Sequence, residues 1–328
     1  MRNAFSDALV AMAQRDPKVL LLTGDHGYAL FDAFRKVCPE QYINCGIAEQ
    51  NMVGVAAGLA KAGFKPVVYG LAAFLPMRVL EQIKIDVCYE NLPVILIGDG
   101  AGVVYSHLGS SHQCTEDIAC TRAIPSLTVL SPADRFEMAA AMQLAFEVSA
   151  PVYLRMGKSD RGDVHQKAIT FKAGQLLPLS AQPKKIALIA TGSMVLTAQA
   201  LVQQGLDAEV WSAPSIKPMD SATLAGISRR VDCIITLEEH SVLNGLGSAV
   251  AELVAEARPL PVYRIGINDK FSSLCGTYDY LLEEHGLTVH ARHQKIILFF
   301  EFEWFTSGLK PERQQKNHFL IANDARRM

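Results

Sequence analysis

Short apolar runs alternate with amphipathic stretches along residues 1–157 of the chain. The runs are rich in Val, Ile and Leu, as in strands that are covered on both faces of a sheet. The stretches between them repeat their apolar positions at helical spacing. This alternation predicts an α/β domain built around a parallel sheet. The expected strands read "KVLLLTG", "QYINC", "PVVYG", "LPVILIG", "SLTVLS" and "PVYLR", and the expected helices cover 3–14, 31–37, 48–62, 81–89 and 134–148.

The pattern breaks at residues 158–183, which are more polar and less periodic and therefore indicate a connector. Alternation resumes over 184–295, with apolar runs such as "KIALIATGS" and "DCIITLEEH". Helical stretches separate these runs at 196–204, 221–229 and 247–256. We therefore expect a second, smaller α/β domain after the connector.

The last segment, 296–328, follows neither pattern, because "IILFFEFEWF" gathers aromatic residues before a polar stretch. As a strand it would be exposed, apolar and prone to aggregation unless another surface covered it. The segment is either an extra element packed on the second domain or a docking segment, and the sequence does not favour the second interpretation. Its role stays unassigned.

Composition and charge bound the class of protein. With 328 residues, the chain has room for about two domains of ordinary size. Half of the residues are hydrophobic and 20% are charged, which is typical of a soluble globular protein. The net charge of −2, without a long block of one sign, argues against a nucleic-acid or membrane-surface partner. No run approaches the roughly 20 apolar residues of a membrane helix, and no signal peptide is evident. Seven Cys without a C-x-x-C pair fit reduced thiols, so we expect a cytoplasmic protein.

The helix expected at 48–62 is unusually thin and carries a single acid at its start. Seven of its fifteen residues are Gly or Ala, and Gly54 and Gly58 lie one turn apart. A Gly costs about 1 kcal/mol relative to Ala inside a helix, so the pair suggests that something approaches the backbone closely. The ordinary interpretation of Glu49 is a first-turn acid that gains about 0.3–1 kcal/mol from the helix dipole. Spacing alone favours that interpretation.

The stretch "NCGIAEQNMVGVAAGLAKAG" and the pattern "FxxxRxxEQI" from Phe74 resemble the pyrimidine-binding domain of the transketolase family. This family of thiamine-diphosphate enzymes includes deoxyxylulose-phosphate synthase. "SHQCTEDIACTRAIPSLTVLSPAD" and "PVYLRMGK" extend the resemblance, which covers residues 1–157. It continues more weakly through "ALIATGSM" and "TLEEHSVLNGLGSAV", which are similar to the family's C-terminal domain, and fades near residue 295.

The resemblance implies a cofactor role for four residues. Glu49 would be the catalytic carboxylate that hydrogen-bonds the aminopyrimidine ring of thiamine diphosphate. Phe74 and Met77 would form the wall of the ring pocket, and Asp25 would lie near the cofactor. Without the resemblance, Phe74 and Met77 would be interpreted as core residues and Asp25 as an ordinary turn residue. The small residues of the thin helix would let Glu49 approach a neighbouring subunit.

The resemblance also implies three substrate-binding residues. His112, in "GSSHQ", corresponds to a catalytic histidine that faces the hydroxyls of the sugar, where a proton shuttle is useful at neutral pH. Arg2 and Arg155 match positions that bind the sugar phosphate, and a guanidinium suits that anion. Without the resemblance, His112 would be a solvated loop residue, and the two arginines would be surface or strand-end residues.

Several positions depart from the family's pattern, so the sugar is not identified by the sequence. Tyr105 and His107 are nearby candidates to compensate. The departures are Met77 and Leu80 in place of aromatic wall residues, Ala29 for a phosphate-binding Ser, Leu108 for an Asp that reads hydroxyl stereochemistry, and Gly100 for a second substrate histidine.

The stretch "IGDGAG" resembles the opening of the magnesium–diphosphate motif of thiamine enzymes, which ends about thirty residues later with Asn ligands. No Asn occurs from residue 92 to residue 243. Since Mg²⁺ prefers a near-octahedral set of oxygen ligands, Asp99 alone is a poor site, and we interpret 98–102 as a tight turn after a strand. We expect no metal site in this chain. The Mg²⁺ and the diphosphate would be held by a partner, the N-terminal transketolase subunit, in a heterotetramer that contains a homodimer of this chain.

The leading hypothesis is therefore a subunit of a thiamine-diphosphate-dependent transketolase, which transfers a two-carbon ketol unit between a ketose and an aldose. The ketose would be phosphorylated. One alternative is a component of a pyruvate-using thiamine enzyme, either like deoxyxylulose-phosphate synthase or like the beta chain of a 2-oxoacid dehydrogenase. Another is a scaffold subunit without catalysis.

Overall fold

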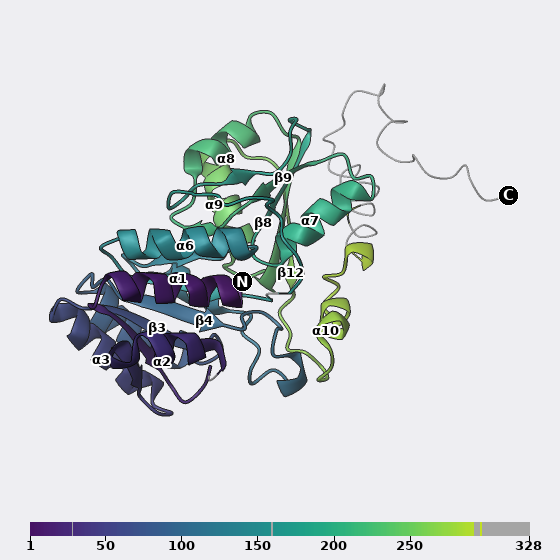
Figure 1. The fold of residues 1–328 in the computed structure, drawn as a ribbon. Helices are drawn as coiled ribbons and strands as arrows, with labels where there is room; N and C mark the ends of the chain where they lie inside the picture. Colours follow the sequence, from purple (N-terminus) through teal and green to yellow (C-terminus); the bar gives the residue numbers. More distant parts are fainter. Residues whose placement is uncertain (28, 159, 292–295, 297–328) are drawn as a thin grey trace, which may run out of the picture.

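The computed structural model describes residues 1–27, 29–158, 160–291 and 296, and these form two parallel-dominated sheets joined by a continuous core (Figure 1). The fold class expected from the sequence is confirmed. The aromatic and polar tail, apart from residue 296, lies outside the described residues. Among the described residues, none lies in a helix long and apolar enough to span a bilayer.

The first sheet has seven strands in the order β10-β5-β6-β4-β3-β1-β2. All neighbours run parallel except β10 and β5, which are antiparallel. The strands are β1 (Val19–Thr23), β2 (Tyr42–Asn44), β3 (Lys65–Leu71), β4 (Ile95–Asp99), β5 (Thr128–Leu130), β6 (Val152–Met156) and β10 (Ser215–Lys217).

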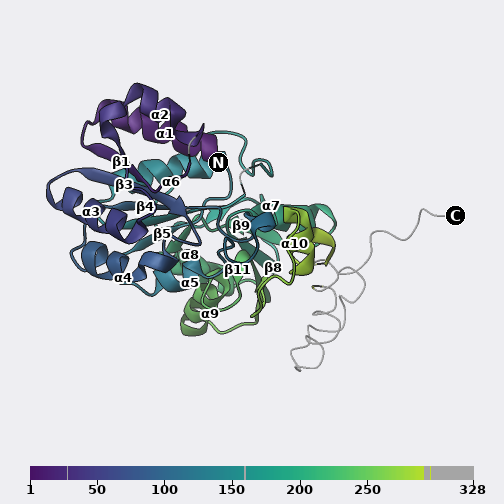
Figure 2. The ribbon, with the colours of Figure 1, turned by 90° about the horizontal axis from the view of Figure 1, so that it is seen from below.

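Helices cover both faces of this sheet, as the continuous apolar runs of its strands require. Helices α1, α2 and α6 pack on one face, and α3, α4 and the π-helical segment η4 pack on the other (Figure 2). The bounds are α1 (Arg2–Arg15), α2 (Asp32–Val37), α3 (Glu49–Lys61), α4 (Leu80–Gln82), η4 (Ile83–Cys88), α5 (Asp117–Arg122) and α6 (Arg135–Glu147), with 3₁₀ turns η1 (Ala29–Phe31), η2 (Pro39–Gln41), η3 (Met77–Val79) and η5 (Ser106–Leu108).

The second sheet has five strands in the order β12-β11-β8-β9-β7. Helices α7 and α10 pack on one side, and α8 and α9 pack on the other, where their core is continuous with that of the first sheet (Figure 2). The bounds are β7 (Leu177–Pro178), β8 (Ile186–Ala190), α7 (Met194–Gln203), β9 (Glu209–Ser212), α8 (Ser221–Ser228), β11 (Cys233–Ser241), α9 (Leu246–Ala257), β12 (Val262–Ile267) and α10 (Tyr278–Glu284).

Local signals explain where the expected helices begin and end. The side chain of Asp134 caps α6 by accepting hydrogen bonds from the backbone nitrogens of Phe136 and Glu137, at 2.9 and 2.8 Å. Helix α3 ends at Lys61, and Gly63 beyond it has a φ of +89°, which glycine adopts without strain. The thin helix therefore begins and ends within one residue of the bounds expected from the sequence, with Ala48 and Ala62 as its caps.

Three elements differ from the expectation. The helix expected at 81–89 is one turn of α-helix followed by the π-helical η4. Strand β7 lies inside the segment expected to be a connector, and pairs antiparallel with β9. Strand β10 belongs to the second half of the chain but joins the first sheet beside β5. The two halves are thus more interlocked than a simple linker implies, and the domain boundaries at 157 and 184 stay a prediction.

Candidate active site

The predicted cofactor residues follow the carboxyl ends of three neighbouring strands. Asp25 follows β1, Glu49 follows β2, and Phe74 follows β3. The strand order reverses here, because β2 lies on one side of β1 and β3 on the other. Ligands of open α/β sheets bind at the carboxyl ends of strands beside such a reversal. The topology therefore brings residues far apart in the sequence to the place where a ligand is expected.

Glu49 is the first residue of α3, and its side chain is buried. One carboxylate oxygen, Oε2, accepts a hydrogen bond from Nη1 of Arg78 at 2.9 Å. The preceding residue, Ala48, offers no side-chain cap, so the amino end of the helix is left to favour the negative charge of Glu49. The first-turn interpretation from the sequence is thus compatible with the structure, but it does not explain the burial.

Phe74 is linked to this carboxylate through Arg78, which is one of two side chains that contact its ring. The guanidinium carbon of Arg78 is 4.3 Å from the ring centroid, within the range of a cation–π contact. The ring of His112 meets the ring of Phe74 at 65°, with 5.4 Å between centroids. Nδ1 of His112 is 3.0 Å from Oγ of Ser111. The structure therefore brings Glu49, Phe74 and His112 into one group, with Arg78 between the first two.

Asp25 is held near this group by contacts between the loops after β1 and β2. Its backbone nitrogen donates to Oδ1 of Asn44 at 3.3 Å, and the same oxygen accepts from Gly46 at 2.9 Å. A Cβ at Gly24 would lie 2.9 Å from the carbonyl oxygen of Gly46, so glycine permits this close approach. Asp25 itself is exposed. Met77 is half-buried and packs near the small cluster of Ala72, Ala101 and Cys114.

His26 also lies in this region, although no motif in the sequence points to it. Its ring is tilted against that of Tyr69, with 5.5 Å between centroids. Burial lowers the pKa of His26, although the charge of Glu49 acts in the opposite direction. A neutral imidazole therefore lies near the candidate cofactor residues. The only signal in the sequence is its position directly after Asp25.

Asp99, which belongs to the "IGDGAG" stretch, is a buried carboxylate with two hydrogen-bond donors and one ion-pair partner. Its Oδ2 accepts from the hydroxyl of Tyr69 at 2.6 Å and from that of Tyr105 at 3.0 Å. Nη2 of Arg2, whose side chain is 45% exposed, lies 3.5 Å from the same oxygen. Burial, together with the charge of Asp99, raises the pKa of both tyrosines, so they remain donors. The group orients Arg2 at the edge of the sheet.

Tyr105 also occupies the space of a missing side chain. A Cβ at Gly100 would lie 2.0 Å from a ring carbon of Tyr105, and Gly100 has a φ of +74°. Gly100 is the position at which the family's second histidine is replaced. The ring of Tyr105 therefore stands where the side chain of that histidine would begin. Leu108, which replaces the Asp of the family's pattern, is 53% exposed.

Arg155 is not grouped with the other predicted substrate residues. Its side chain is 3% exposed, and Nε donates to Asp117 at 2.8 and 3.0 Å. Nη2 donates to the backbone oxygen of Glu239 in the second sheet at 2.8 Å. Although burial alone acts to lower it, the charge of Asp117 raises the pKa of Arg155. Arg155 joins the two halves of the chain, and its phosphate-binding role stays a prediction.

The second half of the chain fixes the loop that carries Tyr105 and His112. Oε1 of Glu239 accepts from the backbone nitrogen of Val103 at 2.8 Å. The backbone nitrogen of Ser241 donates to the carbonyl oxygen of Thr115 at 2.7 Å. A Cβ at Gly102 would lie 2.3 Å from Oε1 of Glu239, so a larger residue would break this contact. Strand β11 thus contributes to the site without reaching Glu49.

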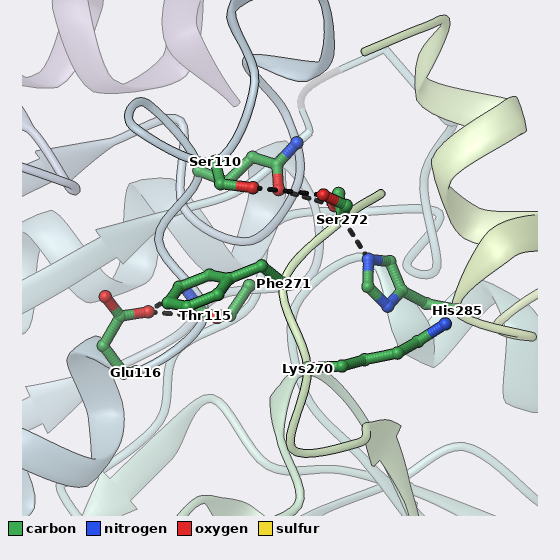
Figure 3. Close-up of a pocket in the computed structure, with 8 residues that line it drawn as sticks. Ser110, Thr115, Glu116, Lys270, Phe271, Ser272 and His285 are labelled. Carbon is green, nitrogen blue, oxygen red and sulfur yellow. Dashed lines mark hydrogen bonds between the residues drawn. The ribbon is translucent and has the colours of Figure 1, made fainter. Parts of the chain in front are cut away.

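A small cavity of about 20 Å³ lies where this loop meets the segment before α10 (Figure 3). Oγ of Ser272 donates to Oε1 of Gln113 at 2.7 Å and lies 2.9 Å from Nε2 of His285. The volume is close to that of one water molecule. The cavity therefore marks a polar contact between the two halves rather than a substrate site.

The outer face of α3 is open at two glycines, as far as the described residues show. A Cβ at Gly54 or at Gly58 would meet no atom within 4 Å. Ile47 is 81% exposed just before the helix, and Val55 is 37% exposed on it. No residue that the structure describes therefore makes the close approach that the two glycines suggest. Among the described residues, no group of three or more His, Cys, Asp or Glu is arranged to hold a metal ion.

The fold and the position of the site define the class of protein. A family model for the transketolase pyrimidine-binding domain matches residues 1–162, and a model for the transketolase C-terminal domain matches residues 176–291. Together these models cover most of the chain. The chain belongs to the transketolase family.

Its relatives include separate transketolase subunits. The chain is 33% identical to the 6-deoxy-6-sulfo-D-fructose transketolase subunit of Clostridium sp. (strain MSTE9), over 90% of this chain and 94% of that protein. It is 36% identical to an apulose-4-phosphate transketolase subunit of Phocaeicola vulgatus, over 82% of this chain and 88% of that protein. A solved structure of a split-gene transketolase, an inactive β4 tetramer, has a TM-score of 0.82 at 37% identity and covers 90% of this chain.

Longer relatives also match. The chain is 34% identical to the 1-deoxy-D-xylulose-5-phosphate synthase of Caldanaerobacter subterraneus, over 87% of this chain but 46% of that protein. The resemblance, the fold class and the class of a transketolase-type transferase are thus confirmed. The roles of the individual site residues stay predictions.

Proposed function

We propose that the chain is the C-terminal subunit of a split transketolase, which moves a two-carbon ketol unit from a ketose to an aldose with thiamine diphosphate. The observation that carries the proposal is the buried carboxylate of Glu49, which Arg78 connects to the half-buried ring of Phe74. The carboxylate lies at the carboxyl edge of the sheet, in the first turn of α3 and among the buried residues of that helix. The family model and the separate-subunit relatives support the same activity.

The residues present fit the pyrimidine ring of the cofactor. The planar cationic guanidinium of Arg78 already lies on Phe74 and donates to Glu49, so a flat donor group is accommodated between them. When bound, thiamine diphosphate supplies the carbon nucleophile and the electron sink of the reaction. Glu49 would accept a hydrogen bond from the ring, and Phe74 and Met77 would contact its faces. Asp25 would border the cofactor from the loop after β1.

The substrate would lie on the side of Phe74 where His112 is found. His112 would exchange a proton with a sugar hydroxyl, since its ring is half-buried and close to the pyrimidine wall. Arg2, oriented by Asp99 and still half-exposed, would bind the anionic end of the sugar. The relatives act on a sulfonated and a phosphorylated sugar by their names, so we propose an anionic ketose as the donor.

The diphosphate and its Mg²⁺ would be held by a separate N-terminal subunit, which packs on the open face of α3. Exposed Ile47 and the unobstructed backbone at Gly54 and Gly58 support that interface. We propose a heterotetramer in which two copies of this chain pair, and a cytoplasmic location. A neighbouring reading frame with a complete Gly-Asp-Gly…Asn motif would encode the partner.

The test is an assay of the reconstituted pair with two donors, a ketose phosphate and pyruvate. Turnover with the ketose phosphate supports the proposal, and turnover with pyruvate alone would assign the chain to the synthase-like alternative that its longer relatives favour. Glu49→Gln in the pair should lower activity by about 100-fold or more, as removal of a catalytic proton partner does. Unchanged activity would support a scaffold subunit instead.

A further inference from the structure

Arg78 makes the two contacts that the proposed site offers to the aminopyrimidine ring. Its guanidinium lies 4.3 Å from the centroid of Phe74, and its Nη1 donates to Oε2 of Glu49 at 2.9 Å. A protonated aminopyrimidine is likewise flat, cationic and a hydrogen-bond donor. Stacking on an aromatic wall and donating to a carboxylate are the interactions expected of both groups.

We propose that Arg78 is an internal placeholder, which occupies the aminopyrimidine position in the cofactor-free chain and leaves it when thiamine diphosphate binds. The inference rests on the proposed function, because it takes Glu49 and Phe74 as the ring-binding residues. It extends that function by identifying what competes with the cofactor. Arg78 belongs to the "FxxxRxxEQI" pattern, but the pattern alone assigns it no role.

The contacts of Arg78 exclude a simultaneous ring in the same position. The guanidinium covers a face of Phe74, while His112 approaches the same ring at an angle of 65°. Oε2 of Glu49 accepts from Arg78 and is therefore engaged. A pyrimidine ring that takes both contacts must displace Arg78. The side chain of Arg78 is 45% exposed, so it can leave towards solvent without unfolding the surrounding structure.

The neighbouring sequence contains a second carboxylate with which Arg78 can pair. Glu81 follows three residues later on an exposed position, the spacing at which oppositely charged side chains meet on a helix. Transfer of the guanidinium from Glu49 to Glu81 would leave the buried carboxylate for the ring. The cofactor-free chain would then be a closed arrangement, and assembly with cofactor would open it.

The test compares thiamine diphosphate binding by reconstituted pairs at a fixed Mg²⁺ concentration, using calorimetry. Arg78→Gln removes the competitor, so the dissociation constant should fall by about threefold to tenfold, the range set by a partly exposed ion pair and a cation–π contact. Arg135→Gln is the matched control. Arg135 lies 4.6 Å from the ring centroid of Phe136 and pairs with Asp163 at 2.9 Å, away from the site.

An unchanged or increased dissociation constant for Arg78→Gln would overturn the placeholder role. Loss of a residue that helps to hold the cofactor would raise the dissociation constant, whereas loss of a competitor lowers it. Glu49→Ala in the same assay separates the two proposals: weaker binding supports the proposed function whatever Arg78 does, and unchanged binding contradicts it. A crystal structure of the cofactor-loaded pair gives a second readout. The guanidinium should be off Phe74 and beyond hydrogen-bond distance of Glu49, and a guanidinium still in place would refute the inference.

Discussion

Two arginines that the family pattern treats alike have different surroundings in this chain. Arg2 is half-exposed and is oriented by Asp99, which also accepts from Tyr69 and Tyr105. Arg155 is buried, and Asp117 and the backbone of Glu239 use its donors. At the scale of single residues, Arg2 therefore has a charged group that a ligand can reach, whereas the donors of Arg155 are used inside the chain.

Arg2→Gln should raise KM for an anionic ketose donor by about tenfold in the reconstituted pair, with a smaller effect on kcat. The reason is that a charge-assisted hydrogen bond to the substrate is lost, while the groups at Glu49 and His112 remain. Steady-state kinetics measures both constants. Arg15→Gln, an exposed arginine in the last turn of the same helix, is the control. An unchanged KM would remove Arg2 from the substrate site.

Arg155→Met should lower the free energy of unfolding by roughly 3–5 kcal/mol, because the buried carboxylate of Asp117 loses its charge partner. Urea denaturation of the chain measures this change. Tyr153 still donates to Asp117 at 2.7 Å in the variant, which limits but does not remove the cost. A variant with normal stability and a raised KM for phosphorylated donors would instead support the predicted phosphate role.

The site residues show what sequence reasoning can reach at this scale. Motif order is sufficient to select Glu49, Phe74 and His112, and the structure groups them. Arg78 was missed because a charged residue on a short helix is ordinarily a solvated one. The burial of Arg155 could not be foreseen, since it depends on Asp117, which is 38 positions away in the sequence. Pairing of that kind is decided by tertiary contacts.

At the scale of elements, α3 combines a buried face with an open one. Met52, Val53 and Ala56 pack into the core, while Gly54 and Gly58 leave the outer side of the backbone uncovered. The pattern of apolar positions predicts this helix and its end, because both signals are local. Strand β10 was not predicted, since three residues carry little periodic signal and their pairing with β5 is a long-range contact.

Gly54→Leu should leave the isolated chain folded and weaken its assembly with the partner subunit. A Cβ at this position meets no atom of the described residues within 4 Å, and the substitution removes the roughly 1 kcal/mol cost of a helical Gly. If this face is the subunit interface, the leucine side chain would prevent the close approach of the partner's backbone. Analytical ultracentrifugation should show a dissociation constant at least tenfold higher than for the wild type.

Gly226→Leu is the matched control for this experiment, because Gly226 is likewise a helical glycine with open space at Cβ. It should assemble normally. Normal assembly of Gly54→Leu as well would show that the open face of α3 is not the subunit interface.

At the scale of the whole molecule, strand β11 connects the second sheet to the loop and helix of the first. His240 is fully buried there: its Nε2 accepts from the backbone nitrogen of Ala119 at 3.3 Å, and its Nδ1 is 2.8 Å from the carbonyl oxygen of Ser241. Burial lowers the pKa of His240 to about 4, against the charge of Asp117. Burial also raises the pKa of neighbouring Glu238 to about 7.

These shifts have opposite consequences for stability. The folded chain binds fewer protons at His240 than the unfolded chain between pH 4 and pH 6.5, so this residue makes stability fall as the pH is lowered through that window. Glu238 binds its proton more tightly when folded, so it makes stability fall as the pH rises from 4.5 to 7. A comparison with a variant at His240 isolates the loss of stability that His240 causes as the pH is lowered.

His240→Asn keeps a donor for the carbonyl oxygen of Ser241 and has no titrating ring. The stability of the wild type relative to this variant should fall by on the order of 2 kcal/mol between pH 6.5 and pH 4. Urea denaturation of both proteins at several pH values measures the difference. A difference that does not change with pH would show that His240 does not titrate differently in the folded chain.

The central claim of this account is that one cofactor is shared between two polypeptides, with Glu49 on this chain and the diphosphate site on the other. The most direct measurement is calorimetric binding of thiamine diphosphate, with Mg²⁺ present, to this chain alone, to the partner alone and to their mixture. We expect tight binding only in the mixture, with a clear loss when Glu49 is replaced by Ala. Tight binding to this chain by itself would contradict it.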